Sequence, residues 1–181
     1  MHFTRLKLQQ FRNYPSLDLA LHPGITVLYG ANGSGKTNLL EAMHLLSLGR
    51  SHRTTQDKEM VAADCETAIV QGYTRRLDGE HEIEIRLYPH QKPQKKLLLY
   101  RKPAQRIGDL MGHATVVMFS PEDIRIIRDG PAARRRFIDM LSLNFFIGIS
   151  SSLHISDTAD LEKVSPQSSS VTFFTFLVET P

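Results

Sequence analysis

The chain of 181 residues contains a single cysteine, Cys65, and no hydrophobic run long enough to cross a membrane. One cysteine excludes an internal disulfide framework and is typical of a protein in a reducing cytoplasm. The first residues, Met1 to Lys7, mix polar with apolar side chains and lack the apolar core of a signal peptide. The sequence therefore predicts a cytoplasmic protein with no membrane partner.

Strong net charge and metal-ligand spacing are lacking as well. The formal net charge of +3 is too small by itself to predict a nucleic-acid partner. Eight histidines are present without paired metal-ligand spacing, so we interpret them as surface or packing residues. With 41% hydrophobic residues, the chain has an ordinary globular composition and enough length for a sizeable core.

Residues 30–37 form a complete P-loop motif, which predicts a nucleoside triphosphate site with ATP and Mg²⁺ as cofactors. Lys36 is expected at the β and γ phosphates, and Thr37 is expected to ligate Mg²⁺. A GTPase would also need an Asn-Lys-x-Asp motif, which the sequence lacks. The predicted cofactor-binding residues of the loop are Gly30, Ala31, Asn32, Gly33, Ser34, Gly35, Lys36 and Thr37.

The residues around the P-loop predict the strand and the helix that this motif needs. Residues 25–29 form a β-branched, apolar run typical of a buried strand. Apolar residues at helical spacing follow the loop, and Gly49 stands where a helix would end. The positive end of that helix would then face the same anion as the amides of the loop.

Other segments predict a mostly β organisation. Alternation predicts strands over residues 3–11, 17–21, 67–77, 81–88 and 95–100, the last three as an antiparallel insert. An apolar strand is expected over 115–119 and a helix, opened by Pro131, over 131–141. Residues 142–181 are rich in serine and contain no arginine, and they predict poorly specified structure.

The P-loop and three further segments resemble the RecF family of bacterial DNA repair proteins, relatives of the SMC and ABC-type ATPase heads. The most specific segment contains Pro-Glu-Asp followed by Arg-Arg-Arg-Phe-Ile-Asp, which ordinary P-loop enzymes do not carry. The resemblance covers residues 1–141, as the N-terminal lobe of such a head, and excludes the tail at 142–181. The P-loop segment is residues 30–42, and the three others are residues 6–14, residues 49–54, and residues 119–123 followed by 130–139.

This resemblance implies an α/β fold of the ABC/SMC-head type, with a mixed core sheet around the P-loop strand and an antiparallel β layer. It implies ATP binding and slow, DNA-stimulated hydrolysis coupled to ATP-dependent head dimerisation. The expected DNA is single-stranded, gapped or at a junction. RecR and RecO are the expected protein partners, in recombinational repair and the SOS response.

The resemblance also implies site residues outside the P-loop. Arg12 and Asn13 close the first strand, where SMC-like heads place groups that touch the nucleotide phosphates; the alternative is that Arg12 caps a turn facing solvent. Arg53, and less so Arg50, stand where relatives carry an arginine that reaches the γ phosphate or DNA. The alternative for this pair is a solvated basic loop.

Two later clusters leave alternatives open. Glu122 and Asp123 match the Q-loop, where either could contact Mg²⁺ or water, or could instead complement the dipole at a helix start. The DNA-binding candidates are Arg134, Arg135 and Arg136, which suit sequence-independent phosphate contacts. Arg135 or Arg136 could instead pair with acids inside the lobe.

The sequence lacks the Leu-Ser-x-Gly-Gln signature and the paired acids of a Walker B strand that complete members of the family carry. The head is therefore expected to be incomplete, with exposed apolar edges beside the P-loop strand. Nucleotide binding is expected to be weak at best and hydrolysis close to nil. Two other functions remain open. One is a P-loop phosphotransferase, a small-molecule or nucleotide kinase; the other is a DNA-binding module that binds nucleotide without turnover.

Overall fold

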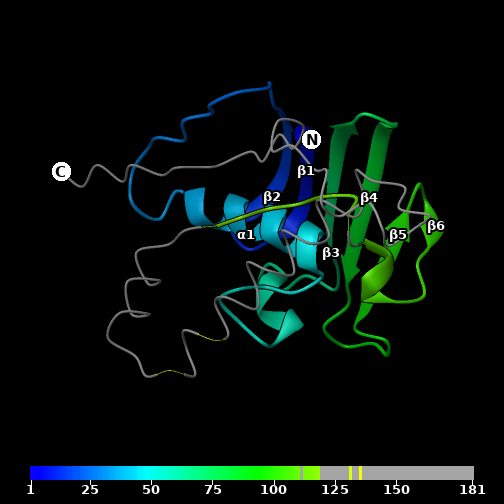
Figure 1. The fold of residues 1–181 in the computed structure, drawn as a ribbon. Coiled ribbons are helices and arrows are strands. Elements are labelled where there is room, and N and C mark those ends of the chain that lie inside the picture. The colour runs from blue at the N-terminus through cyan, green and yellow to red at the C-terminus, as the bar shows by residue number, and fades with distance from the viewer. Residues whose placement is uncertain (111, 119–130, 132–134, 136–181) are drawn as a thin grey trace.

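The computed structural model describes residues 1–110, 112–118, 131 and 135. In this part of the chain a six-stranded antiparallel sheet carries one α-helix, α1 (Lys36–Leu48), across its face (Figure 1). The strands lie in the order β2-β1-β3-β4-β5-β6. Their bounds are β1 (His2–Phe11), β2 (Tyr14–Ala20), β3 (Ala68–Arg76), β4 (Gly79–Leu87), β5 (Lys95–Leu99) and β6 (Lys102–Pro103), with 3₁₀ turns η1 (Asp57–Met60) and η2 (Ile107–Leu110).

The register of the sheet brings apolar residues into rows that run across the strands. One row pairs Leu6 with Leu19 and Gly72, and continues to Ile83. The next row of the same face contains Leu17, Leu8, Val70, Ile85 and Leu97. Because side chains alternate between the two faces of a strand, these rows form one continuous apolar face.

Helix α1 packs on this face and fixes the position of the P-loop that precedes it. It lies close to β3 because Gly72 carries no side chain: a Cβ there would stand 2.6 Å from Cδ1 of Leu46. Leu46 and Leu45 are completely buried. The helix ends at Gly49, whose left-handed backbone (φ 66) lets its N–H bond to the carbonyl of Leu45 at 2.7 Å.

Several predictions from the sequence are confirmed. The N-terminal hairpin, the meander over β3, β4 and β5, and the helix that ends at Gly49 are all present. The meander is not a separate insert, however, because β3 pairs with β1 along most of its length and extends the sheet that the N-terminal hairpin begins. The antiparallel layer is thus a single sheet.

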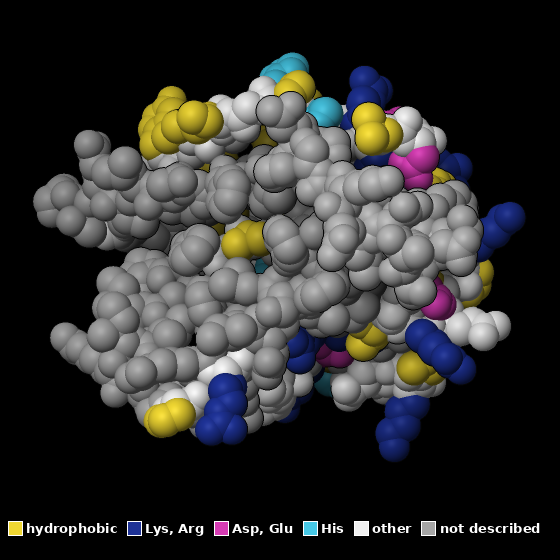
Figure 2. Space-filling view, viewed as in Figure 1, with side chains coloured by type: hydrophobic (Ala, Val, Ile, Leu, Met, Phe, Trp, Pro, Cys, Tyr) yellow, Lys and Arg dark blue, Asp and Glu magenta, His cyan; other side chains and the backbone are white. Residues whose placement is uncertain are grey.

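The predicted buried strand over residues 25–29 is wrong. These residues form no strand, and the side chains of Ile25, Val27 and Tyr29 are 92%, 71% and 92% exposed. Figure 2 shows hydrophobic side chains gathered over the segment between β2 and α1. A strand requires a hydrogen-bonded neighbour, and the described residues provide none for this segment, in line with the expected exposed apolar edges.

The later elements are described only in part. Over residues 112–118 the structure has isolated bridges at Ala114 and Val117 in place of the expected strand. Pro131 and Arg135 are helical and exposed, as expected for a helix opened by Pro131. Glu122, Asp123, Arg134, Arg136 and the tail at 142–181 lie outside the described residues. Within the described residues, no helix has both the length and the apolar character needed to span a bilayer.

Candidate nucleotide-binding site

The P-loop joins the exposed segment 25–29 to the first turn of α1, and Gly35 is its tightest point. Gly35 has a φ of 105°, a region that residues with a side chain rarely adopt. A Cβ at this position would lie 2.7 Å from Oδ1 of Asn13 and 2.9 Å from Cε2 of Tyr14. Glycine is therefore required both by the backbone and by the residues beneath the loop.

The Lys36 ammonium lies against the loop. Its Nζ donates hydrogen bonds to the carbonyl oxygens of Gly30, at 2.7 Å, and Ala31, at 2.9 Å. Residues 31–34 and Thr37 are exposed, whereas Gly35 is buried. The loop thus presents its outer surface and one lysine charge to solvent at the start of a helix.

The first turn of α1 contains no acidic residue. The unpaired N–H groups of a helix start carry a partial positive charge, which an acidic side chain in the first turn would compensate. Here that charge stays uncompensated within the turn and adds to the charge of Lys36. The loop and the helix start together favour an anion.

A hollow of about 270 Å³ opens beside the loop. Its walls combine aromatic and apolar side chains with the loop itself: Tyr14, Val27, Leu28, Tyr29, Ser34, Lys36 and Leu39. A flat apolar group attached to an anion at the loop could occupy such a hollow.

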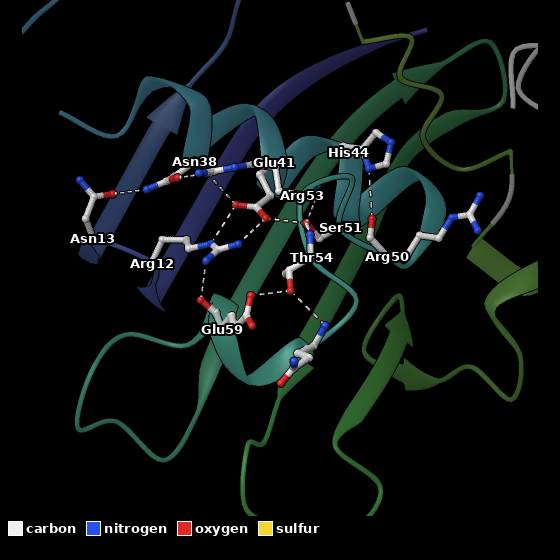
Figure 3. A network of polar contacts seen from close by, with 11 residues as sticks. Arg12, Asn13, Asn38, Glu41, His44, Arg50, Ser51, Arg53, Thr54 and Glu59 are labelled. Carbon is white, nitrogen blue, oxygen red and sulfur yellow. Dashed lines mark hydrogen bonds and ion pairs between the residues drawn. The ribbon is translucent and has the colours of Figure 1, made fainter. Parts of the chain in front are cut away.

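A line of side-chain amides supports the loop from below (Figure 3). Asn13 donates from Nδ2 to the carbonyl oxygen of Ser34 at 3.2 Å, and Asn38 donates to Oδ1 of Asn13 at 2.8 Å. Arg53 in turn donates from Nη1 to Oδ1 of Asn38 at 2.7 Å. Three segments that are distant in the sequence therefore meet under the P-loop.

Glu41 is the buried centre of this network, with a side chain that is 0% exposed. Arg12 binds its carboxylate through two parallel hydrogen bonds of 2.9 and 2.7 Å and also donates to the carbonyl oxygen of Glu59 at 2.6 Å. Ser51 donates to the same carboxylate at 2.5 Å, and Arg53 approaches it at 3.5 Å. This forked geometry is the strongest arrangement of an arginine with a carboxylate.

The pKa of Glu41 is lowered by these partners. Burial raises the pKa of this carboxyl, but the hydrogen bonds from Arg12 and Ser51 and the charges of Arg12 and Arg53 outweigh that effect. Glu41 is therefore ionised at neutral pH, and the arginines beside it have a permanent counter-ion.

The structure brings most of the predicted site residues together. The P-loop, Arg12, Asn13 and Arg53 form one contiguous region. The Arg50 side chain is exposed, and its carbonyl oxygen lies 3.1 Å from Nδ1 of His44. Arg12 is bound to Glu41 and also donates to the carbonyl oxygen of Glu59 in the turn η1. Its contact with the nucleotide stays a prediction, as does that of Arg53.

The sequence analysis missed Asn38, Glu41 and Ser51. Glu41 had a detectable signal, since it is the only formally charged residue in the stretch from Leu39 to Leu48, which is otherwise mostly apolar. A buried acid at such a position needs a cationic partner. Sequence spacing gave no means of choosing Arg12 and Arg53 from the many arginines.

Comparison with protein families decides the relationship. Residues 2–118 match the family model described as the RecF/RecN/SMC N-terminal domain. The chain belongs to this family. The match runs from β1 to the last described residues before position 119 and therefore includes the whole candidate site.

Relatives within the RecF/RecN/SMC family carry the name DNA replication and repair protein RecF. The protein of that name from Lacticaseibacillus casei is 42% identical over 140 residues, which are 77% of this chain and 37% of that protein. The one from Geobacillus thermodenitrificans is 35% identical over 167 residues, 92% of this chain and 43% of that protein. The chain thus spans about two fifths of the length of these relatives.

Solved structures confirm the fold class of an ABC/SMC-type head. The recombination mediator protein RecF with ATP, from the RecFOR pathway, matches with a TM-score of 0.71 and 35% identity, over 82% of this chain and 42% of that one. The SMC head domain of Thermotoga maritima matches with a TM-score of 0.55 and 17% identity, over 72% of this chain and 52% of that one. The second likeness concerns the fold alone.

Proposed function

We propose that this chain binds ATP at the P-loop and serves in DNA replication and repair as a RecF-type protein. The observation that carries the proposal is the lysine held inside a glycine loop at the start of a helix with no acid in its first turn. The RecF structure solved with ATP supports ATP as the nucleotide. The nucleotide phosphates would lie on the loop, with the base over the adjoining hollow.

The residues of the site fit ATP and Mg²⁺. The proposed phosphate ligands are the amides of residues 30–37 and the side chain of Lys36, with Arg12, Asn13 and Arg53 beneath and beside them. Thr37 is exposed, and its hydroxyl makes no hydrogen bond with another described residue, so it is available to Mg²⁺. Bound Mg²⁺ would neutralise phosphate charge.

DNA that is single-stranded, gapped or at a junction is the proposed macromolecular ligand. RecR and RecO are the proposed protein partners, and the complete protein is proposed to form an ATP-dependent homodimer. The names of the relatives support the repair role. Arg135 is helical and exposed. This supports a contact between the cluster Arg134 to Arg136 and the phosphate backbone of DNA. We assign residues 1–141 to the head lobe and residues 142–181 to a tail outside it. We propose that the protein takes part in the SOS response and is located in the cytoplasm.

The test is binding of a labelled gapped duplex by the full chain, with and without ATP, together with ATP turnover. We expect ATP to increase DNA affinity, the affinity to fall steeply with salt, and turnover to be close to nil. Arg135→Ala should weaken DNA binding more than Arg5→Ala, a change at an exposed arginine of the sheet. Phosphate transfer to a small acceptor, without any effect of ATP on DNA binding, would support a kinase and contradict the proposal.

A further inference from the structure

The amides beneath the P-loop can adopt only one orientation. The line begins at a carbonyl oxygen, that of Ser34, which can only accept, and ends at the guanidinium of Arg53, which can only donate. Asn13 and Asn38 must therefore each present Nδ2 towards the P-loop and Oδ1 towards Arg53. The P-loop backbone and Arg53 are thus joined by a directional chain of three hydrogen bonds.

The charges of the groups that meet at the Glu41 carboxylate do not balance. Glu41 carries one negative charge, and the two guanidiniums of Arg12 and Arg53 carry two positive charges. Arg12 donates to both oxygens of the Glu41 carboxylate, from Nε and Nη2, and its side chain is only 18% exposed. Arg53 reaches the same carboxylate only at 3.5 Å and is 41% exposed. Of these two guanidiniums, Arg53 is therefore the one whose charge Glu41 compensates less.

The contact that holds Arg53 most closely is with a neutral acceptor, Oδ1 of Asn38. A hydrogen bond from a guanidinium to a carboxylate or phosphate is roughly twice as strong as one between neutral groups. An incoming phosphate can therefore compete for Arg53 with an amide oxygen, whereas a carboxylate at position 38 would retain it. Asn38 lies one residue beyond Thr37, in the first turn of α1.

We propose that Asn38 and Glu41 are positioning residues that hold Arg53 beside the triphosphate site and leave its charge available to the terminal phosphate. Because the Glu41 carboxylate is paired with Arg12, its contact with Arg53 is only a weak one at 3.5 Å. Asn38 sets the direction of the Arg53 guanidinium through a bond that a phosphate can replace. This inference rests on the proposed binding of ATP.

The experiment compares the dissociation constants of the full chain for ATP and for ADP, because only ATP carries the third phosphate. Asn38→Asp should lower the preference for ATP over ADP by on the order of tenfold, since a carboxylate retains Arg53. Asn38→Ala, which removes the acceptor that sets the direction of Arg53, should lower the preference less than Asn38→Asp does. Glu41→Gln removes the carboxylate charge that competes with the phosphate for Arg53. This variant should therefore increase the preference for ATP over ADP, the opposite of the effect of Asn38→Asp.

A double variant separates positioning from general damage. In an Arg53→Ala background, Asn38→Asp should cause a smaller further loss of ATP preference than in the wild type, because only the repulsion between the new carboxylate and the third phosphate is left. Damage to the loop would instead weaken ATP and ADP equally. Equal weakening of ATP and ADP binding by Asn38→Asp, or a loss of preference in the double variant as large as in the wild-type background, would overturn the inference. If the wild-type chain bound neither nucleotide, the proposed function itself would fail.

Discussion

The zone beneath α1 and the segment that leads into the P-loop contain similar apolar residues in opposite surroundings. In the first, side chains such as Leu6, Ile83 and Leu46 are completely buried between the sheet and the helix. In the second, Ile25 and Tyr29 are each 92% exposed. The difference lies in the neighbours, since the first zone is covered by pairing strands and a helix that the described residues themselves provide.

This contrast shows which half of the site is fixed by packing. Helix α1, which follows the P-loop, rests on buried rows of the sheet and on the Arg12–Glu41 pair. The segment 25–29, which precedes the P-loop, has no hydrogen-bonded neighbour strand among the described residues. Substitutions in the two zones should therefore differ sharply in their effect on the free energy of unfolding. The predictions below begin with the largest expected difference.

The first comparison uses two arginine–carboxylate pairs of the same forked geometry. Arg12 binds the fully buried Glu41, whereas Arg5 binds Asp18 at 2.6 and 2.7 Å on the surface. Arg12→Ala leaves the buried carboxylate with only the hydrogen bond from Ser51 and the long contact with Arg53, and should lower the free energy of unfolding by about 3–5 kcal/mol. Arg5→Ala should cause no measurable change, because solvent screens the exposed pair. Denaturant unfolding measures both.

A control for that pair is the double variant Arg12→Ala with Glu41→Gln. Removing the negative charge should recover part of the stability that Arg12→Ala loses, because a neutral amide is cheaper to bury than a carboxylate. Equal losses for the single and the double variant would show that Arg12 acts through packing and would contradict the account of this pair.

The second comparison uses apolar side chains of the two zones. Leu46→Ala removes a completely buried side chain beside Gly72 and should cost about 2–5 kcal/mol of unfolding free energy. Ile25→Ala changes a side chain that is 92% exposed and should stay within about 0.5 kcal/mol. Thermal and denaturant unfolding of both variants would check this, and a large cost at Ile25 would show that the segment is covered in solution.

The third comparison concerns pH. Burial, followed by the nearby charge of His52, lowers the pKa of His44 to about 4. Arg50 lowers it further, while the hydrogen bond to the Arg50 carbonyl and the charge of Glu41 raise it. Because the folded pKa lies below the unfolded value of 6.5, the stability from neutral His44 is present above pH 6.5 and is lost as the pH falls towards 4.

Between pH 7.5 and pH 5.0 this group should lower the free energy of unfolding by roughly 2 kcal/mol. His44→Gln should remove that part of the pH dependence, and His22→Gln, at an exposed histidine, should keep it. The measurement is denaturant unfolding at both pH values. An unchanged pH dependence in His44→Gln would show that another group titrates in this window.

The same contrast explains how far the sequence predicts the structure. The strands β3 and β4 were predictable because each pairs with its neighbour in the chain and alternates apolar with polar residues. The segment 25–29 was not, since its β-branched composition says nothing about whether a partner strand is present. Within the site, the P-loop was readable from its motif, whereas the Asn38 and Glu41 contacts depend on which distant loops fold over α1.

The most direct test of the account is the affinity of the full chain for ATP with and without the Lys36 charge. The measurement is a titration with Mg²⁺ and ATP of the wild type and of Lys36→Met, both shown to unfold at the same temperature. The account predicts that the variant loses affinity by at least about tenfold, because the ammonium that we propose as a phosphate ligand is gone. Equal affinity of the two proteins would contradict the account.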